Sequence, residues 1–246
     1  PAFVGVIGFV CLVGIWELAG AFARMGITLT VTPLYVGAIG MITCAWWLGS
    51  EGTLLALYIT VFVCAAWRLL DRRQESRMSD VVSSTFTAVY VPFLASFVVL
   101  MLAAWRDPWV FVVFELMVIA NDTGGWAAGV LFGKHPMAPA LSPKKSWEGF
   151  AGSALTAVGV GCVGLWLLGA AWWWGIVAGV SIAFVGTMGD LTESLIKRES
   201  GLKDMSQILP GHGGVLDRVD ALLMSAPVAY FIFAWALPGI SWESSH

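Results

Sequence analysis

Charged residues are scarce in this sequence: Asp, Glu, Lys and Arg make up 12% of its 246 residues, whereas hydrophobic residues make up 59%. A monomeric chain of this composition cannot stay soluble, which excludes a soluble enzyme and indicates a polytopic membrane protein. The net charge of −3 is uninformative, because the few charges are unevenly distributed along the chain. We expect the lipid bilayer, and no nucleic acid, among its partners.

Paired cysteines and nucleotide-binding P-loops are also missing. The four cysteines stand singly in apolar runs, without CxxC or Cys/His spacing, at Cys11, Cys44, Cys64 and Cys162. This pattern indicates neither a disulfide framework nor a zinc site and favours small buried apolar side chains. No GxxxxGKS or GxxxxGKT sequence occurs, which argues against a P-loop nucleotide hydrolase.

Apolar runs long enough to cross a membrane dominate the rest of the chain, because a hydrocarbon core of about 30 Å takes about 20 residues of helix. We expect eight spanning helices, at about 2–23, 28–48, 52–70, 81–104, 108–132, 147–169, 171–188 and 215–237. The runs do not alternate, which excludes a membrane β-barrel. The predicted fold is an all-α, polytopic transmembrane helix bundle. It forms a single integral membrane domain, 1–246, with N-terminal helices in 1–104 and a motif-bearing catalytic half in 105–246.

Basic residues indicate the orientation, because Lys and Arg favour cytoplasmic loops. If the first helix enters from outside, 12 of the 13 basic residues fall at the cytoplasmic face, and only Arg106 falls outside. The polar loops 71–80, 133–146 and 189–214 would then share one aqueous surface. The sequence begins at Pro1 without an initiator Met, so we expect a trimmed start and leave open a further upstream helix.

Two places inside the apolar runs carry acids. Glu17 is the only acid well inside the first three helices, and a structural hydrogen bond and a functional role are equally open for it. In the fifth run, 121–125 reads Asn-Asp-Thr-Gly-Gly, and Glu115 lies two helical turns before Asp122 on the same face. The glycine pair permits a close backbone approach or a break in the helix. A polar seam between helices is the alternative to a binding site.

A basic segment precedes the sixth helix. Residues 141–149 read Leu-Ser-Pro-Lys-Lys-Ser-Trp-Glu-Gly. The hydroxyl groups of Ser142 and Ser146 flank Lys144 and Lys145, just before a helix start whose free N–H groups favour an anion. Together these groups could bind phosphate, although the lysine pair could also be only a marker of the cytoplasmic side.

Charge and glycine concentrate near the end of the chain. The seventh helix is expected to end near residue 188, with Asp190 closing it. If the helix persists, spacings of three and seven residues place Glu193 and Lys197 on one face with Asp190. The following 201–214 segment contains too much glycine and proline for a regular helix. We predict a loop there that offers backbone N–H groups to a ligand.

Two acids open the last helix. Asp217 and Asp220 lie one helical turn apart, beside Arg218, and carboxylates in such a place suit Mg²⁺ together with substrate phosphates. A return through the 201–214 loop would bring Asp190 to the same membrane depth. We therefore expect Asp190, Asp217 and Asp220 to converge on Mg²⁺, in a phosphate-handling site without a protein nucleophile.

The stretch from Ser194 to Asp220, SLIKRESGLKDMSQILPGHGGVLDRVD, resembles throughout the signature of the phosphatidate cytidylyltransferases, membrane enzymes that make CDP-diacylglycerol from CTP and phosphatidate. Two earlier segments resemble further landmarks of that family. They are 122–124, followed by Phe132-Gly133-Lys134, and 142–149, in which Ser146 replaces the usual Thr and keeps the hydroxyl. The resemblance implies a nucleotidyltransferase of phospholipid biosynthesis in the cell inner membrane, with its active site at the cytoplasmic face.

The resemblance also implies residue roles and partners. The implied catalytic residues are Asp190, Lys197, Arg198, Asp217 and Asp220, of which the three aspartates would hold Mg²⁺, with a second cation left open. The implied substrate-binding residues are Asp122, Ser142, Lys144, Lys145, Ser146, Glu148, Lys203, Asp204, His212, Gly213, Gly214 and Arg218. The implied partners are CTP, phosphatidate and a second copy of the chain in a homodimer.

Two other classes of membrane protein fit parts of the pattern. A transporter would also use helices with internal acids, but transport sites usually lie near the bilayer midplane between repeats, and the charges here gather on one side without a repeat. A CDP-alcohol phosphotransferase also handles CDP-lipids and metal. Its DGxxAR arrangement with widely spaced aspartates is absent from this sequence.

Overall fold

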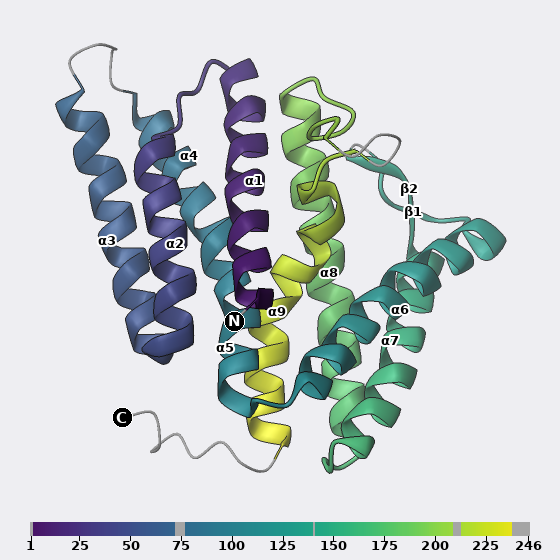
Figure 1. Ribbon diagram of the computed structural model, residues 1–246. Coiled ribbons are helices and arrows are strands. Elements are labelled where there is room, and N and C mark those ends of the chain that lie inside the picture. The colour runs from purple at the N-terminus through teal and green to yellow at the C-terminus, as the bar shows by residue number, and fades with distance from the viewer. Residues whose placement is uncertain (1, 72–76, 140, 209–212, 238–246) are drawn as a thin grey trace. The chain divides into compact units, whose positions relative to one another are not determined.

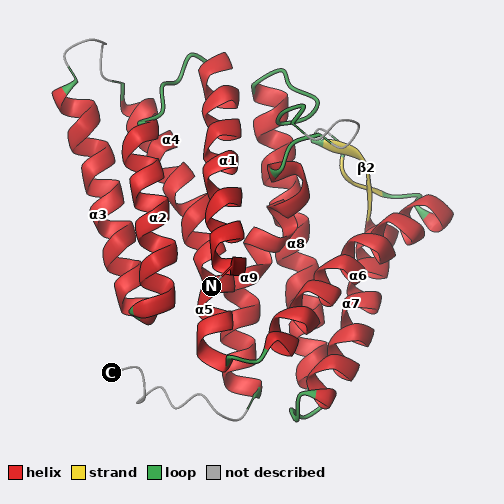
Figure 2. Cartoon of the chain, in the orientation of Figure 1, coloured by secondary structure: helices red, strands yellow, loops and turns green. Residues whose placement is uncertain are grey.

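The computed structural model describes residues 2–71, 77–139, 141–208 and 213–237. These residues are predominantly helical (Figure 2), which confirms the predicted all-α class. The chain divides into two compact units, each assembled from two separate segments. The first unit comprises Pro1–Ala103 and Ile196–Val219, and the second comprises Ala104–Leu195 and Asp220–His246.

Within the described ranges, seven helical spans are long and apolar enough to cross a membrane. They are α1 (Ala2–Arg24), α3 (Gly49–Leu70), Met78–Trp105, α6 (Pro108–Phe132), α7 (Trp147–Leu167), α8 (Trp174–Glu199) and α9 (Leu216–Ala236). A further apolar helix, α2 (Val31–Trp47), is shorter, with 17 residues. Every predicted apolar run is therefore helical, and the chain is a multi-pass membrane protein.

The first unit contains α1, α2, α3 and the Met78–Trp105 span as far as Ala103 (Figure 1), with α2 packed along α3. The long span consists of α4 (Met78–Ala88), the π-helix η1 (Val89–Phe93) and α5 (Leu94–Trp105). Pro92 lies inside the π-helix. A wider turn accommodates the residue that lacks an N–H and would disrupt a regular helix.

A buried ion pair joins helix ends within the first unit. Nε and Nη2 of Arg68, in the last turn of α3, donate to Oδ2 of Asp80, in the first turn of α4, at 2.8 and 2.5 Å. Oδ1 of Asp80 accepts from the backbone N–H of Thr28, in the connection between α1 and α2, at 2.9 Å. The end of α3, the start of α4 and this connection therefore meet at one side of the unit.

In the second unit, glycines allow α6 and α7 to pack closely. A Cβ atom on Gly124 would lie 2.8 Å from the carbonyl oxygen of Gly152, and one on Gly152 would lie 2.7 Å from the carbonyl oxygen of Gly124. The hydroxyl of Ser153 also donates across this contact to the carbonyl oxygen of Asn121, at 2.7 Å. The glycine pair in α6 thus permits a close approach, while the helix itself continues unbroken.

The predicted end of the seventh helix is wrong. α8 continues to Glu199, about three turns beyond residue 188, so Asp190 lies inside the helix instead of closing it. This polar extension contains no proline. Its charged side chains also find partners, because Asp190 pairs with Lys145 and Lys197 pairs with Asp217.

The polar loop predicted at 133–146 connects α6 to α7 and has secondary structure of its own. This segment contains a short antiparallel hairpin of β1 (Pro136–Ala138) and β2 (Ser142–Ser146), with an irregularity in its register. The backbone N–H of Trp147 donates to the carbonyl oxygen of His135 at 3.0 Å and closes the base of the hairpin. β2 leads directly into α7.

Candidate active site

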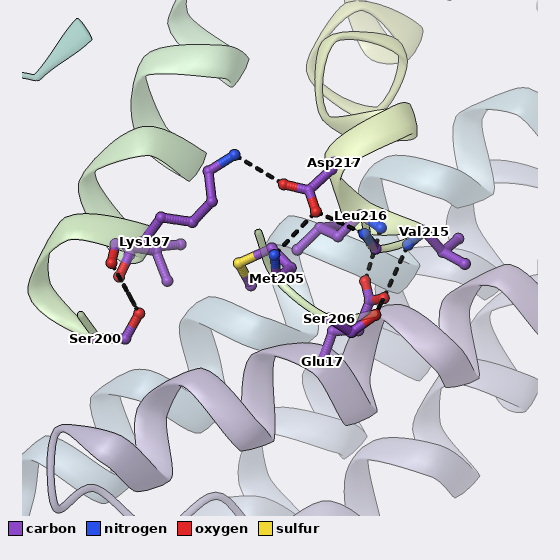
Figure 3. Close-up of polar contacts among 10 residues, drawn as sticks. Glu17, Lys197, Ser200, Met205, Ser206, Val215, Leu216 and Asp217 are labelled. Atoms are coloured by element: carbon purple, nitrogen blue, oxygen red, sulfur yellow. Dashed lines mark hydrogen bonds and ion pairs between the residues drawn. The ribbon is translucent and has the colours of Figure 1, made fainter. Parts of the chain in front are cut away.

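In the first unit, the predicted catalytic residues Lys197 and Asp217 form an ion pair (Figure 3). Nζ of Lys197, in α8, lies 2.8 Å from Oδ1 of Asp217, in the first turn of α9. Oδ2 of Asp217 accepts from the backbone N–H groups of Gly214 at 2.7 Å and Met205 at 2.9 Å. Three donors therefore fix this carboxylate, whose side chain is 10% exposed.

Two glycines of the predicted loop have structural reasons to be glycine. Gly213 has a φ of 78°, in the left-handed region that other residues rarely adopt. A Cβ atom on Gly214 would lie 2.6 Å from Oε1 of Glu17. The backbone at Gly214 can therefore lie against Glu17 and still donate its N–H to Asp217.

In the second unit, Lys145 of β2 forms an ion pair with Asp190 of α8. Asp122 of α6 lies close enough to interact with the charges of both Lys145 and Asp190. Asp220 of α9 interacts in turn with Asp190 and with Glu193, one helical turn further along α8. Asp190 therefore interacts with two further aspartates, Asp122 and Asp220, and Lys145 offsets part of this negative charge.

A close contact between α8 and α9 brings part of this cluster together. A Cβ atom on Gly189 would lie 2.8 Å from the carbonyl oxygen of Asp220 and 3.0 Å from Cγ of Met224. Only a residue without a side chain fits there unless one helix shifts. Gly189 thus allows Asp190, the next residue in α8, to lie next to Asp220.

Ser146 and Glu148, predicted to bind substrate, have structural contacts at the start of α7. Ser146 is the N-cap residue, and its hydroxyl accepts from the N–H of Gly149 at 3.1 Å. Oε2 of Glu148 accepts from the N–H groups of Lys134 and His135, at 3.1 and 3.2 Å, and Oε1 lies 2.5 Å from Nδ1 of His135. These contacts hold the hairpin that presents Lys145, and the substrate contacts of both residues stay predictions.

The other predicted substrate-binding and catalytic residues are mostly at the surface. The exposed side chains are those of Asp122, Lys144, Arg198, Lys203, Asp204 and Arg218. Ser142, in β2, is partly exposed, and His212 lies outside the described residues. Cations at the surface are accessible to phosphate groups, and their contacts with substrate stay predictions.

The predicted Mg²⁺ site is not preassembled. Among the residues that the structure describes, no group of three or more His, Cys, Asp or Glu side chains is arranged to hold a metal ion. The donor chemistry nevertheless fits, because Asp190 and Asp220 interact through like charges that a divalent cation would offset. Asp217 would have to share its oxygens with Lys197 and two backbone N–H groups. The convergence of the three aspartates on Mg²⁺ therefore stays a prediction.

Two acids outside the predicted site contact its residues. Glu17 accepts hydrogen bonds from Ser206, Val215 and Leu216, and Glu193 interacts with Asp220. An isolated acid in an apolar helix was the sequence signal for Glu17, but spacing could not identify partners at least 189 positions away. For Glu193, the signal was its place one helical turn after Asp190.

The fold and the site define a class of protein: a multi-pass helical membrane protein in which two lysines pair with aspartates of α8 and α9. The model of the cytidylyltransferase family matches residues 1–236. The chain belongs to this family, and it is a membrane nucleotidyltransferase.

Individual relatives support the same assignment. The phosphatidate cytidylyltransferase of Mycobacterium bovis is 38% identical over 244 residues, covering 94% of this chain and 79% of the relative. That of Mycobacterium tuberculosis is also 38% identical, with 94% and 74% covered. The Pseudomonas aeruginosa enzyme of the same name is 33% identical over 271 residues, with 95% and 88% covered. The resemblance drawn from the sequence motifs is thereby confirmed.

Proposed function

We propose that this chain transfers the cytidylyl group of CTP to phosphatidate, giving CDP-diacylglycerol and pyrophosphate for phospholipid biosynthesis. The observation that carries the proposal is the pairing of Lys145 with Asp190 and of Lys197 with Asp217. These four residues lie in or beside the segments that resemble the family's motifs. Relatives named phosphatidate cytidylyltransferase match the chain over most of its length, which supports the same reaction.

This reaction needs no nucleophile from the protein. An ionised phosphate oxygen of phosphatidate attacks the α-phosphorus of CTP and forms a new P–O bond. The bond from the α-phosphorus to the oxygen that bridges to the β-phosphorus breaks, and pyrophosphate leaves with that electron pair. The protein has to align the two substrates and to stabilise the negative charge that builds up on the leaving group.

The two lysines are suited to that task. The side chains of Lys145 and Lys197 are 25% and 21% exposed, so each ammonium group is oriented by its carboxylate and still accessible from solvent. A phosphate oxygen that approaches either lysine would form a charge-assisted hydrogen bond. Lys144 and Arg198, both exposed, add positive charge in the same two segments.

We propose Asp190, Asp217 and Asp220 as the residues that hold Mg²⁺. The proposal leaves room for a second cation in the same site. When bound, Mg²⁺ would neutralise charge on the triphosphate and on the leaving pyrophosphate. Lys145 forms an ion pair with Asp190, and Lys197 forms one with Asp217, so a lysine orients each of these carboxylates. Carboxylate oxygens are hard ligands that suit Mg²⁺.

The site is proposed to open on the cytoplasmic side of the cell inner membrane. In the first unit, Arg68 and Arg77 lie at helix ends beside Asp80, and basic residues favour that side. Cysteines placed at Lys203 and Arg106 in a cysteine-free background test this with a membrane-impermeant maleimide on intact cells. We expect labelling at Arg106 only, and labelling at Lys203 alone would contradict the orientation.

The family resemblance supports a homodimer. Light scattering of the purified protein in detergent, corrected for bound detergent, measures the protein mass directly. We expect twice the 26.4 kDa of one chain. A mass of one chain across the working concentration range would contradict the dimer.

The function is tested with purified protein, CTP, phosphatidate and Mg²⁺. We expect CDP-diacylglycerol in the lipid extract, identified by mass spectrometry, and an equal amount of pyrophosphate in the aqueous phase. The Asp190→Asn variant serves as the inactive control. A CDP-alcohol phosphotransferase would instead consume CDP-diacylglycerol and an alcohol and release CMP, and a transporter would make neither product. Either of those results would overturn the proposal.

A further inference from the structure

Glu17 is a buried acid in the apolar helix α1. It lies seven residues before the end of that helix at Arg24, and the residue is 1% exposed. A carboxylate inside a membrane-spanning helix costs several kcal/mol unless other groups satisfy it. Its position therefore requires a compensating set of donors.

Three donors meet this carboxylate within the first unit (Figure 3). Oε1 accepts from the hydroxyl of Ser206 at 2.6 Å and from the N–H of Val215 at 2.8 Å. Oε2 accepts from the N–H of Leu216 at 2.7 Å. The two N–H groups belong to the start of α9 (Leu216–Ala236), where a helix has no internal partners for them. A negative charge is also favourable at this end of the helix dipole.

The same backbone segment fixes Asp217. Gly214 lies against Glu17, since an added Cβ would be 2.6 Å from Oε1 and 2.9 Å from Cδ. The N–H of Gly214 donates to Oδ2 of Asp217 at 2.7 Å, and Lys197 donates to Oδ1 at 2.8 Å. Glu17 and Asp217 therefore hold one stretch of backbone between them, and a shift of that stretch would move Asp217 relative to Lys197.

We infer that Glu17 is a positioning residue for the proposed cytidylyl transfer: it anchors the start of α9 and so sets the place of Asp217. This inference rests on the proposed function. Among the described residues, Glu17 contacts Ser206 and the backbone at 214–216, and it acts on Asp217 through that backbone. The close contact between Glu17 and the backbone at position 214 also accounts for the glycine there, because any side chain would displace the carboxylate of Glu17.

The test compares Glu17→Gln with the wild type and with Glu51→Gln, an exposed acid of α3 that serves as the matched control. Glutamine keeps the size of the side chain. Its amide NH₂ would face the N–H of Leu216 or Val215, where the carboxylate accepts a hydrogen bond. We expect kcat to fall by about 10- to 100-fold, as for a small misplacement of a catalytic group, while KM for phosphatidate stays near the wild-type value.

A second readout separates positioning from general folding. Hydrogen–deuterium exchange should become faster in peptides that contain Val215 and Leu216, and it should not change in α3 and α4, where the Arg68–Asp80 ion pair lies. Gly214→Ala, which pushes the carboxylate away without removing it, should reproduce the loss of kcat. The Glu51→Gln control should match the wild type in both measurements.

The outcomes are distinguishable. A wild-type protein that makes no CDP-diacylglycerol refutes the proposed function itself. An active wild type whose Glu17→Gln and Gly214→Ala variants keep kcat overturns the positioning role. Faster exchange throughout the first unit would make Glu17 a folding residue and would also overturn it. Lowered kcat with faster exchange confined to the start of α9 supports it.

Discussion

Removing the ammonium group of Lys197 should strongly impair the reaction, because this group holds Asp217. In Lys197→Met the apolar stem remains and the 2.8 Å contact to Oδ1 is lost. The pair is partly buried, with 21% and 10% of the side chains exposed. A hydrogen bond to a charged group contributes about 1.5–3 kcal/mol. Since about 1.4 kcal/mol corresponds to a tenfold change in rate, we expect kcat/KM to fall by about 10- to 100-fold.

A double-mutant cycle tests whether the two residues act as one unit. Asp217→Asn leaves an amide NH₂ facing Lys197, so it should lose at least as much activity as Lys197→Met. The double variant should lose much less than the product of the two single effects, because residues in direct contact are not additive. The assay follows label from CTP into lipid, with thermal unfolding as a check on folding. Arg24→Met, exposed at the end of α1, is the control.

Two results would refute this reasoning. One is a Lys197→Met enzyme with activity within about twofold of the wild type, which would correspond to less than about 0.5 kcal/mol. The other is a double variant whose loss equals the product of the single losses. Either would mean that the ion pair does not contribute to the reaction as a unit.

Three further perturbations are predicted. Lys145→Met should lower kcat/KM by about tenfold or more. It should change the free energy of unfolding by less than about 1 kcal/mol, because the side chains of Lys145 and Asp190 are 25% and 35% exposed. A loss of stability with normal activity would contradict this. Asp80→Asn should lower the free energy of unfolding in detergent by about 1.5–3 kcal/mol, because the buried Arg68 would lose its closer carboxylate and keep Asp71, at 3.6 Å. Unchanged unfolding by denaturant would contradict this. Gly189→Ala should lower the free energy of unfolding by about 1–3 kcal/mol and should also lower activity, because the new Cβ would lie 2.8 Å from the carbonyl oxygen of Asp220. Wild-type values in both assays would show that α8 and α9 can move apart without consequence.

The membrane-spanning fold followed from hydropathy, because a bilayer requires long apolar helices whatever their partners. Reliance on hydropathy also explains why the end of α8 was predicted too early. Residues after Gly189 no longer follow the hydropathy pattern, and their helix is supported by ion pairs to Lys145 and Asp217, which hydropathy does not register. The hairpin of β1 and β2 is held by Glu148, from the helix that follows it.

The site was predictable where spacing within one element determined it. The helical spacing of Asp190 and Glu193 indicated a shared face, and both interact with Asp220. The partners of Lys197 and Glu17 depend on how distant segments of the chain pack. A single amino-acid sequence, read by itself, does not reveal which distant segments are in contact. Glu17 stood out only as an acid in an apolar helix, which left its role open.

The most direct test of the central claim is the fate of label from two forms of CTP. Purified protein with phosphatidate and Mg²⁺ is supplied with CTP labelled at the α-phosphorus or at the γ-phosphorus. Cytidylyl transfer predicts that the α-label enters the lipid and that all of the γ-label appears in pyrophosphate. Entry of the γ-label into the lipid would indicate phosphoryl transfer, and lipid without either label would indicate no transfer, so each result would contradict the account.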